Sequence, residues 1–530
     1  MTSRRRLAVI LCLVTLAVWS PVFGNDFAFD DVIDIVVNAR IRDWSTAWQA
    51  FLHPFNWGTN FQGHLQTYRP LVLVSHVVTY HLWGLHPFGH HVLRVLLHVA
   101  VELLAFLLLC RWLTNVRVAF AFALVCAIHP ACVEAIHSPS GDLYLALFGL
   151  AALLLSSAEH PRPWHAIPIG ALLLLSMLAK EGGVLYVLLA VAFAELSRRR
   201  AEPVRPLSSL WPVVCAAVVA VAVYAGMRHH ALGAQTLPSN AGAGRLADAV
   251  TGVWFFATQA FVIPLARAPA ILDFAATPQI DRIGWYGLAA CNLIVVGVLV
   301  QRRRWLEAIG FLWWLISLAP SAAVMLTEGA WPGLYRWLYM GMPGLLLAIA
   351  GALSPKLPTR RPRLVVTAWA LVCVAFACLS IRATRAWRND VTLFSAMAIE
   401  SPEHFWGYRR LGWALYYRAR FADAIPVLQR AAELAPADER DSCIGLWAAS
   451  LAGIDDCDGA VKLYIAHAPT PMMSADHFAY VAGACFERQG RIDRALQLYR
   501  ACGAAEPRCP AAVERLTHPG SSVGQPGKPL

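Results

Sequence analysis

Two adjacent aspartates, Asp30 and Asp31, are the residues best suited to chemistry, because a carboxylate can take a proton from a hydroxyl group as a general base. They directly follow an apolar segment, Leu7–Phe23, which has three arginines before it at positions 4–6. Basic residues stay on the cytoplasmic side of a membrane, so we expect the aspartates on the far side. Adjacent side chains on a helix or turn point apart, and the two should therefore have different roles.

Further ionisable residues gather at the predicted outer helix ends. We interpret them as candidates for substrate and phosphate binding: Tyr68, Arg69, Glu134, Asp142, Lys180, Glu181 and Arg336. Arginine binds phosphate through two parallel hydrogen bonds and lysine as a point charge, so Arg69, Lys180 and Arg336 can stabilise a phosphate leaving group. Ionisable side chains cost about 2.5–3.5 kcal/mol at the centre of a membrane helix and tend to be functional. Both signs of charge on the outer face indicate an active site there.

Each candidate also has a structural interpretation. The aspartate pair can cap a helix that starts near Val32. Lys180 and Glu181 can form an interfacial ion pair, and Arg336 can anchor a helix end. Five histidines resemble a metal cluster by count, but no carboxylate accompanies them at helical spacing, and we predict no metal and no cofactor: His76, His81, His86, His90 and His91.

The composition predicts an integral membrane protein. Of the 530 residues, 58% are hydrophobic and only 15% are charged, whereas soluble domains have about 45–50% apolar residues. Many separate apolar runs predict a polytopic all-α membrane helical bundle embedded in a lipid bilayer, and not a barrel. The net charge of +11 is explained by arginine clusters in short loops, so we predict no nucleic-acid partner.

Charge alternation between the apolar segments predicts about eleven crossings. The segments are Leu7–Phe23, His91–Leu113, Val118–Val133, Leu143–Ser157, Trp164–Ala179, Val184–Leu196, Leu210–Met227, Gly284–Val300, Trp305–Ala319, Trp337–Ala350 and Leu364–Ile381. Every second gap between them is basic, which places the N-terminus in the cytoplasm and the C-terminus outside. A cleaved signal peptide is the alternative for the first segment, but no clean small-residue cleavage site precedes Asn25.

Two apolar stretches are predicted not to cross. Leu71–Trp83 is short, and Val250–Ala266 ends in Ile263-Pro264. If either crossed alone, the later arginine clusters would move outside, so we interpret both as amphipathic or re-entrant helices on the outer face. If both cross, the count becomes thirteen and the segment between them inverts.

The sequence changes character after about Arg382. Three alanines, Ala424, Ala460 and Ala495, lie 36 and 35 residues apart. Small residues at helix contacts and a proline at the end of each unit are typical of tetratricopeptide repeats, whose period is about 34 residues. We predict a transmembrane domain at 1–381 with its first outer loop at 24–90, a linker at 382–399, an extracytoplasmic repeat α-solenoid at 400–516, and a disordered tail at 517–530.

Five of the 13 cysteines lie in the repeat segment at 400–516, where disulfides can form if it is outside the cytoplasm. Cys443–Cys457 and Cys485–Cys502 are candidate pairs because each can link neighbouring helices, although sequence does not fix connectivity. Buried unpaired thiols are the alternative.

Several motifs, in order along residues 7–510, resemble the transmembrane and tetratricopeptide-repeat O-mannosyltransferases. They are Phe29-Asp30-Asp31, Asn56-Trp57-Gly58, Tyr68-Arg69-Pro70-Leu71, Gly84-Leu85-His86-Pro87-Phe88-Gly89, His129-Pro130 with Glu134 and Asp142, Leu178-Ala179-Lys180-Glu181, Tyr335-Arg336-Trp337-Leu338-Tyr339, and Trp387-Arg388-Asn389 with Thr392-Leu393-Phe394. Each motif alone is weak, but their order is specific. The family is similar in fold to the GT-C glycosyltransferases.

The resemblance implies a polyprenyl-phosphate sugar donor, no metal, and inversion at the sugar carbon. It also implies that a carboxylate of the first outer loop is catalytic, which corresponds to Asp30 or Asp31. The chain departs from the family in having about three repeats, in Tyr335-Arg336-Trp337 where the family has Glu-Arg-Tyr, and in lacking the usual tryptophan and arginine after Glu134. These departures leave the sugar and the acceptor open.

The leading interpretation is a glycosyltransferase that moves a sugar, with mannose a candidate, from polyprenyl phosphate to a protein or glycan outside the cytoplasm. It would lie in a bacterial inner membrane, with periplasmic repeats holding the acceptor. An oligosaccharide or O-antigen ligase is an alternative enzyme. It would use a polyprenyl diphosphate as donor, and it would have a large outer loop late in the chain, which the predicted bundle lacks. A membrane-anchored repeat scaffold would have no reason to gather Asp30, Lys180 and Arg336 on one side. A transporter would show an inverted pair of interrupted helices.

Overall fold

The computed structural model describes residues 3–57, 67–138, 140–158, 162–233, 271–273, 279–318, 330–332, 336–354, 362–467, 474–502 and 506–518. In these ranges the regular structure is helical apart from one short antiparallel strand pair, β1 (Ile271–Asp273) and β2 (Ala330–Pro332). The prediction of an all-α fold is confirmed at this level. The chain divides into two compact units, Met1–Asn389 and Asp390–Leu530, which are described separately.

Four helical segments of the first unit are long and apolar enough to cross a membrane. They are α1 (Ser3–Trp19) with the 3-10 turn η1 (Ser20–Gly24), α4 (Pro87–Trp112), η6 (Leu207–Leu210) with α10 (Trp211–Leu232), and α17 (Pro362–Ala386). At 1.5 Å per residue, the 26 residues of α4 span about 39 Å, more than the roughly 30 Å of a bilayer core. Pro87 suits the start of α4, because the first N–H groups of a helix have no partner within the helix.

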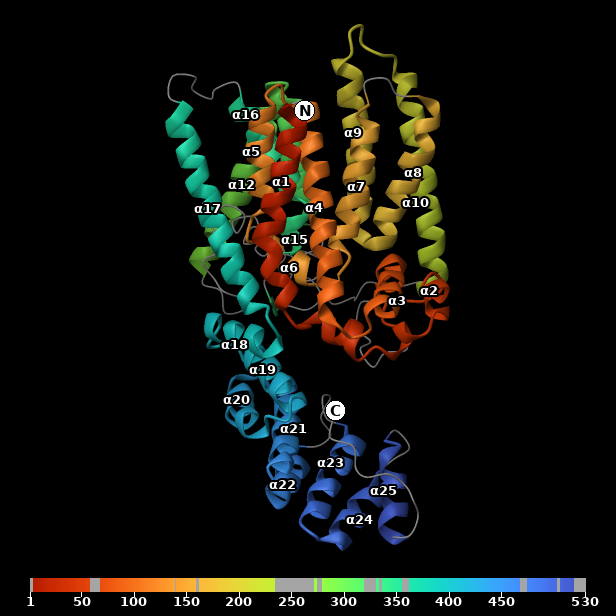
Figure 1. Ribbon diagram of the computed structural model, residues 1–530, viewed down its shortest axis with the longest axis vertical. Coiled ribbons are helices and arrows are strands. Elements are labelled where there is room, and N and C mark those ends of the chain that lie inside the picture. Colours follow the sequence, from red (N-terminus) through yellow and green to blue (C-terminus); the bar gives the residue numbers. More distant parts are fainter. Residues whose placement is uncertain are drawn as a thin grey trace. The chain divides into compact units, whose positions relative to one another are not determined.

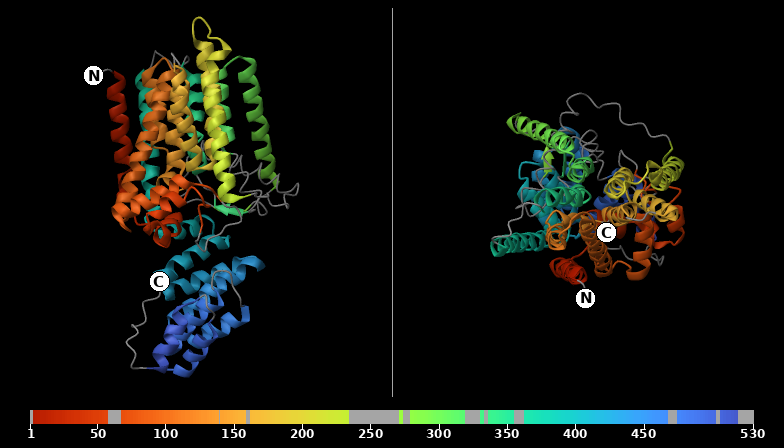
Figure 2. Two further views of the ribbon diagram at one scale, coloured as in Figure 1. Left: turned by 90° about the vertical axis from the view of Figure 1, so that its right-hand side faces the viewer. Right: turned by 90° about the horizontal axis from the view of Figure 1, so that it is seen from above.

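Shorter apolar helices run alongside these four in the bundle (Figures 1 and 2). They are α5 (Val116–Ala127), α7 (Asp142–Ser156), η4 (Pro163–His165) with α8 (Ala166–Ala179), part of α12 (Gln279–Gln301), α13 (Trp305–Ser317) and α16 (Met342–Leu353). The turn η5 (Glu181–Gly183) joins α8 to α9 (Val184–Arg200). Helices α13 and α16 approach closely, because a Cβ on Gly310 would lie only 2.7 Å from the carbonyl oxygen of Gly344. Such small residues let membrane helices pack backbone to backbone.

Two predicted crossings are interrupted in the structure. The prediction of one helix over Val118–Val133 is wrong, because α5 ends at Ala127 and a separate helix α6 (Cys132–His137) follows the turn at His129-Pro130. The segment Trp337–Ala350 divides into α15 (Arg336–Tyr339) and α16, with a proline in the first turn of α16. Proline lacks an N–H and is tolerated at a helix start but not inside a helix. The short helices α6 and α15 pack against each other.

The segment between α1 and α4 folds into short helices at the end of the bundle where α1 ends (Figure 1). They are the π-helical turn η2 (Val32–Val36), η3 (Ala39–Arg42), α2 (Ser45–Gln49) and α3 (Pro70–Trp83). A buried apolar cluster joins them: Phe27, Ile35, Ile41, Ala50, Leu73 and Val77. The 14 residues of α3 span about 21 Å, less than the roughly 30 Å of a bilayer core. The other stretch predicted not to cross, Val250–Ala266, lies outside the described residues.

The second unit consists of successive helices, each packed against the next. They are α18 (Asp390–Glu400), α19 (Phe405–Tyr417), α20 (Phe421–Leu434), α21 (Ala437–Gly453), α22 (Cys457–His467), α23 (Ala475–Arg488), α24 (Ile492–Ala501) and α25 (Arg508–Thr517). The evenly spaced Ala424, Ala460 and Ala495 are fully buried, one each on α20, α22 and α24. Residues 382–399, predicted as a linker, form the end of α17 and most of α18.

Two disulfides connect helices of this unit. Cys457–Cys485 joins α22 to α23, and Cys502–Cys509 joins the end of α24 to α25. The predicted pairs Cys443–Cys457 and Cys485–Cys502 are therefore wrong. Cys443 is instead a buried free thiol in the apolar contact between α20 and α21.

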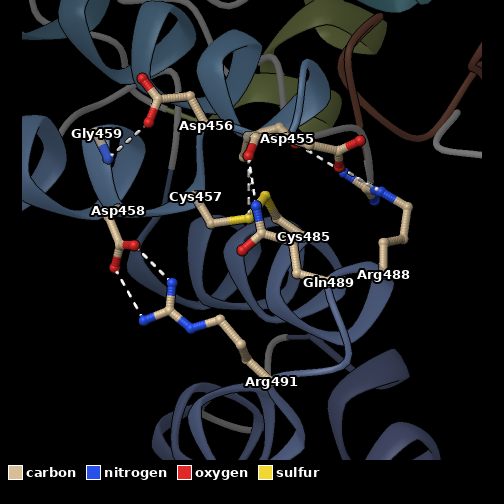
Figure 3. The surroundings of a disulfide bond; sticks show 10 residues. Asp455, Asp456, Cys457, Asp458, Gly459, Cys485, Arg488, Gln489 and Arg491 are labelled. Carbon is tan, nitrogen blue, oxygen red and sulfur yellow. Dashed lines mark hydrogen bonds and ion pairs between the residues drawn. A yellow bond between two sulfur atoms is a disulfide. The ribbon is translucent and has the colours of Figure 1, made fainter.

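Two ion pairs lie beside the Cys457–Cys485 bond (Figure 3). Arg488 Nε donates to Asp455 Oδ1 at 2.9 Å, and Arg491 Nη1 donates to Asp458 Oδ2 at 2.5 Å. Both arginines come from α23 or the turn after it, and both acids come from the start of α22 or the turn before it. The covalent bond and the ion pairs thus fix the same junction.

Candidate active site

The aspartate pair lies at a sharp backbone bend just beyond α1 and η1. Phe29 has a φ of 58°, in the left-handed region that bulky residues rarely adopt. Asp31 precedes the turn η2, but its side chain makes no capping hydrogen bond to that turn. Helix capping is therefore not its role, and the two carboxylates bind different arginines.

Asp31 forms a buried ion pair with Arg94 of α4. Nη2 and Nη1 of Arg94 donate to the two Asp31 oxygens at 2.5 and 3.0 Å. Nη1 also donates to the His137 carbonyl at 2.7 Å. Burial raises the pKa of Asp31, and the charge of Arg94 opposes this rise. The Asp31 side chain is only 1% exposed, so this buried ion pair holds the first loop against α4.

Asp30 is the more open of the two carboxylates, with 28% of its side chain exposed. Arg336 Nη1 donates to Asp30 Oδ2 at 2.7 Å, and the Ser138 hydroxyl donates to the same oxygen at 3.0 Å. Arg336 Nη1 also donates to the Ser138 hydroxyl oxygen at 3.0 Å. Among the described residues, nothing hydrogen bonds to the other oxygen, Oδ1.

Glu134 of α6 is the second acid beside Arg336. Arg336 Nε lies 3.2 Å from Glu134 Oε1, and the Arg336 backbone N–H donates to Oε2 at 3.3 Å. Burial raises the pKa of Glu134 to about 7, although the charge of Arg336 lowers it. Burial disfavours the charge on Arg336, but Asp30 and Glu134 outweigh it and raise the pKa of this arginine. A permanent cation thus lies beside a carboxyl group that can hold a proton near neutral pH.

Lys180 binds Asp142 and not its sequence neighbour Glu181. Lys180 Nζ lies 2.7 and 2.8 Å from the two Asp142 oxygens, and the Ser140 hydroxyl donates to Asp142 at 2.5 Å. Burial lowers the pKa of Lys180, and Asp142 opposes this effect. Gly141 permits the contact because its φ is 90° and a Cβ there would lie 2.5 Å from the carbonyl oxygen that precedes Lys180.

Glu181 joins the first loop to the start of α9. Arg69 Nε donates to Glu181 Oε2 at 3.1 Å, and the Tyr68 backbone N–H donates to Oε1 at 3.1 Å. Burial acts to raise the pKa of Glu181, but the charge of Arg69 and these hydrogen bonds outweigh it, so the pKa is lowered. The Tyr68 hydroxyl donates to the Phe51 carbonyl at 2.8 Å, which ties the two parts of the first loop together.

A third aspartate of the first loop, Asp34, lies in η2 and is partly exposed. Within the part of the chain that the structure describes, it makes no hydrogen bond or ion pair. Burial raises its pKa well above the usual range, and the charges of Asp30 and Asp31 add to this rise. Arg69 and Arg336 act in the opposite direction. The charges of the site therefore act on the Asp34 carboxyl group, although among the described residues none forms an ion pair with it.

Three site residues are absent from the sequence-based candidates. Arg94 carries a signal, because an arginine inside an apolar membrane segment is costly and tends to be functional. Asp34 also carries one, since it lies four residues after Asp30 and helical spacing puts the two on one side. Ser138 has no sequence signal of this kind, because a serine just after a helix is common in any protein.

A small cavity of about 30 Å³ lies beside Arg94 and Ser138, the residues that bind Asp31 and Asp30. Its lining includes His76, His90, Arg94, Ser138 and Tyr144. One water needs about 10–15 Å³ of such volume, and ligand pockets have about 300–1,000 Å³. The cavity has room for water beside Arg94 and not for a sugar.

Two of the five histidines considered as a metal cluster bind different backbone carbonyl groups. His90 Nε2 lies 3.0 Å from the Gly84 carbonyl, and His91 Nε2 lies 3.3 Å from the Asp26 carbonyl. A different buried group, His98, Glu102 and Cys132, brings possible ligand atoms within 4.8 Å of one another. Both ring nitrogens of His98 are already engaged there, with the Tyr339 hydroxyl and the Ala127 carbonyl at 2.8 and 2.9 Å.

Comparison with known proteins identifies relatives across most of the chain. A protein O-mannosyl-transferase of Caenorhabditis elegans is 24% identical over 449 residues, 81% of this chain and 63% of that protein. The protein O-mannosyl-transferase TMTC3 of Mus musculus is 30% identical over 194 residues, 34% of this chain and 20% of that protein. TMTC1 of Mus musculus is 32% identical over 178 residues, 30% of this chain and 19% of that protein. The family resemblance is confirmed.

The matched region spans less than two thirds of the length of each of these TMTC-type relatives. No family model matches the chain, and no solved structure matches it. Long apolar helices together with such relatives indicate a membrane protein.

Proposed function

We propose that the chain is a membrane glycosyltransferase that moves a sugar, with mannose the leading candidate, from a polyprenyl-phosphate donor to a hydroxyl group of a protein. The names of the relatives support sugar transfer to protein. The observation that carries the proposal is the 2.7 Å contact between Asp30 and Arg336. It brings an open carboxylate and a permanent cation together at one end of an apolar bundle, which is the arrangement that a lipid-linked phosphate donor requires.

In the proposed reaction, the bond between the sugar C1 and the phosphate oxygen breaks, and a bond between C1 and the acceptor oxygen forms with inversion. The proton of the acceptor hydroxyl passes to a carboxylate of the first loop. Arg336 stabilises the charge that develops on the leaving polyprenyl phosphate. Arg69 and Lys180 add positive charge nearby, each balanced by an acid, Glu181 and Asp142. No cofactor is needed, since the donor carries the activated sugar.

The two aspartates have different parts in this proposal. Asp30 meets the substrate region and holds Arg336 in place through Oδ2. Asp31 is enclosed by Arg94 and keeps the start of the loop against α4. Loss of either aspartate should reduce transfer, but only loss of Asp31 should also remove a large part of the folding stability.

The proposal also includes a topology of about eleven crossings with the site outside the cytoplasm, in a bacterial inner membrane. The second unit would be a tetratricopeptide-repeat solenoid on the same side that holds the acceptor. Its two disulfides support an oxidising compartment, because such bonds are rare in the cytosol. The buried alanines spaced 36 and 35 residues apart support the repeat interpretation.

A scaffold without enzymatic activity is disfavoured by the same geometry. Asp30 and Arg336 are in contact, and Lys180 is close enough to Arg336 for the two charges to affect each other. Burying several paired charges is costly, and a scaffold gains nothing from it. A ligase that uses a polyprenyl diphosphate is distinguished by its donor and is included in the test below.

The test is sugar transfer by the purified full chain in detergent, with an envelope extract as acceptor. The donors are radiolabelled polyprenyl-phosphate mannose and glucose and a polyprenyl-diphosphate oligosaccharide. The variants are Asp30→Asn and Asp31→Asn, with Asp43→Asn as the matched control, because Asp43 is an exposed aspartate of the same loop. We expect transfer from a monophosphate donor by the wild type and the control, and none by Asp30→Asn. Transfer only from the diphosphate, or none from any donor, contradicts the proposal.

A further inference from the structure

Asp34 occupies a distinctive place in the first loop. It lies in the π-helical turn η2, four residues after Asp30. The next residue, Ile35, is fully buried in the apolar cluster with Phe27 and Leu73 and so fixes the turn. Asp34 itself is partly exposed. The turn therefore holds a carboxyl group beside Asp30 with its oxygens still open to solvent or substrate.

Every other carboxyl group of the site has a cation as its partner. The pairs are Asp30 and Glu134 with Arg336, Asp31 with Arg94, Asp142 with Lys180, and Glu181 with Arg69. Asp34 has no such partner among the described residues, although Arg69 and Arg336 are near enough to act on it electrostatically. Within the part of the chain that the structure describes, Asp34 is thus the one acid of this group with no hydrogen-bond or ion-pair partner.

We propose that Asp34 takes the proton from the acceptor hydroxyl, an inference that rests on the proposed glycosyltransferase function. The acceptor oxygen bonds to the sugar C1 as the bond from C1 to the phosphate oxygen breaks. The hydroxyl proton moves to the Asp34 carboxylate, the bonding electrons of the broken bond leave with polyprenyl phosphate, and Asp34 later releases the proton to water. Asp30 then serves to hold Arg336 against the departing phosphate.

Hydrogen bonding favours Asp34 over Asp30 for this step. Oδ2 of Asp30 already accepts hydrogen bonds from Arg336 and from Ser138. A carboxylate stabilised by a cation and a hydroxyl group is a poorer proton acceptor than one without partners. Asp34 loses no existing hydrogen bond when it accepts the proton.

The charges that face Asp34 also suit a general base. Burial has the largest effect and raises the pKa of Asp34, and the negative charges of Asp30 and Asp31 raise it further. The positive charges of Arg69 and Arg336 lower it. The net effect is a pKa well above the usual aspartate value, which is closer to a working pH near neutrality. A general base is most effective when its pKa lies near that pH.

The test is the pH dependence of kcat/KM for mannose transfer from polyprenyl-phosphate mannose, measured with the purified full chain. The variants are Asp34→Asn, Asp34→Glu and Asp30→Asn, with Asp43→Asn as control. In the wild type we expect kcat/KM to rise with pH through an apparent pKa above about 4. Asp34→Asn should lower kcat by about 100-fold or more and abolish this rise, with the donor KM nearly unchanged. Asp34→Glu should restore part of the activity and the pH-dependent limb.

Several outcomes separate this inference from the proposed function. If the wild type transfers sugar and Asp34→Asn keeps both its rate and its pH profile, Asp34 is not the base while the function stands. The inference also fails if Asp34→Asn raises the donor KM with kcat unchanged, because that result describes a binding role. If the wild type transfers nothing, both fail. Thermal unfolding of each variant in detergent checks that lost activity is not lost folding.

Discussion

Arg94 binds Asp31 and the His137 carbonyl with a single buried guanidinium group. Ser138, the next residue after His137, donates its hydroxyl to Asp30. One arginine of α4 therefore fixes both the loop that carries the aspartates and the residue that orients the open one. The accessible carboxylate is positioned through its neighbours on both sides.

The Asp31–Arg94 pair should behave as a buried unit in folding. Removing one partner leaves an uncompensated charge, so Asp31→Ala should lower the free energy of unfolding by about 3–5 kcal/mol. The double variant Asp31→Ala/Arg94→Leu should recover much of that loss, because no buried charge remains. Chemical unfolding of the detergent-solubilised chain measures both values. The single variant Arg94→Leu completes the cycle, and if the losses in Asp31→Ala and Arg94→Leu simply add in the double variant, the pair is not coupled.

Glu134 should make stability depend on pH. Its folded pKa of about 7 lies above the ordinary value of 4.5, so between these values the native state holds a proton that the unfolded state has lost. Its contribution to stability is present below pH 4.5 and is lost as the pH rises to about 7. Glu134→Gln should flatten this decline. The melting temperatures of both proteins across that window provide the measurement, and parallel curves would contradict the assignment.

Arg336 should not be replaceable by lysine. An ammonium group keeps the charge but cannot contact Asp30, Ser138 and Glu134 together as the planar guanidinium does. We expect Arg336→Lys to lower kcat by about 10–100-fold and Arg336→Gln by about 100-fold or more. The matched control is Arg117→Lys, at an exposed position away from the site. Full activity in Arg336→Lys would mean that charge alone is sufficient.

The Cys457–Cys485 bond should contribute substantially to the second unit. Closing a loop with a sequence separation of 28 corresponds to about 3–4 kcal/mol on chain-entropy grounds. Cys457→Ser should therefore lower the unfolding temperature under oxidising conditions. Cys443→Ser is the comparison, because that thiol is unpaired. Peptide mapping without reductant identifies the bond directly, and finding both thiols free would refute it.

The helical character of the fold and many site residues were predictable from sequence, because apolar runs and misplaced charges have clear physical signatures. The ion-pair partners were not predictable. Lys180 and Glu181 are adjacent in sequence, yet Lys180 binds Asp142 and Glu181 binds Arg69, both from distant segments. Ion-pair partners depend on how helices pack, and a local sequence does not contain that information.

The break after α5 and the disulfide connectivity illustrate the same limit. The sequence shows the His129-Pro130 motif but not its structural effect. The helix ends before the motif, and the residues after it form the separate helix α6, which places Glu134 beside Arg336. The predicted cysteine pairs rest on the expectation that each links neighbouring helices, and several helices meet that condition. Cys443 instead faces an apolar contact between two helices, so its nearest cysteine in sequence bonds elsewhere.

The bond between Cys457 and Cys485 also has a mechanical consequence. A row of stacked helices can bend where one helix packs on the next. The junction of α22 with α23 is crosslinked by a disulfide and carries two ion pairs, so it is a poor hinge. Flexing of this unit is therefore expected at junctions that carry no disulfide, such as the apolar contact of α20 with α21, where Cys443 is a free thiol.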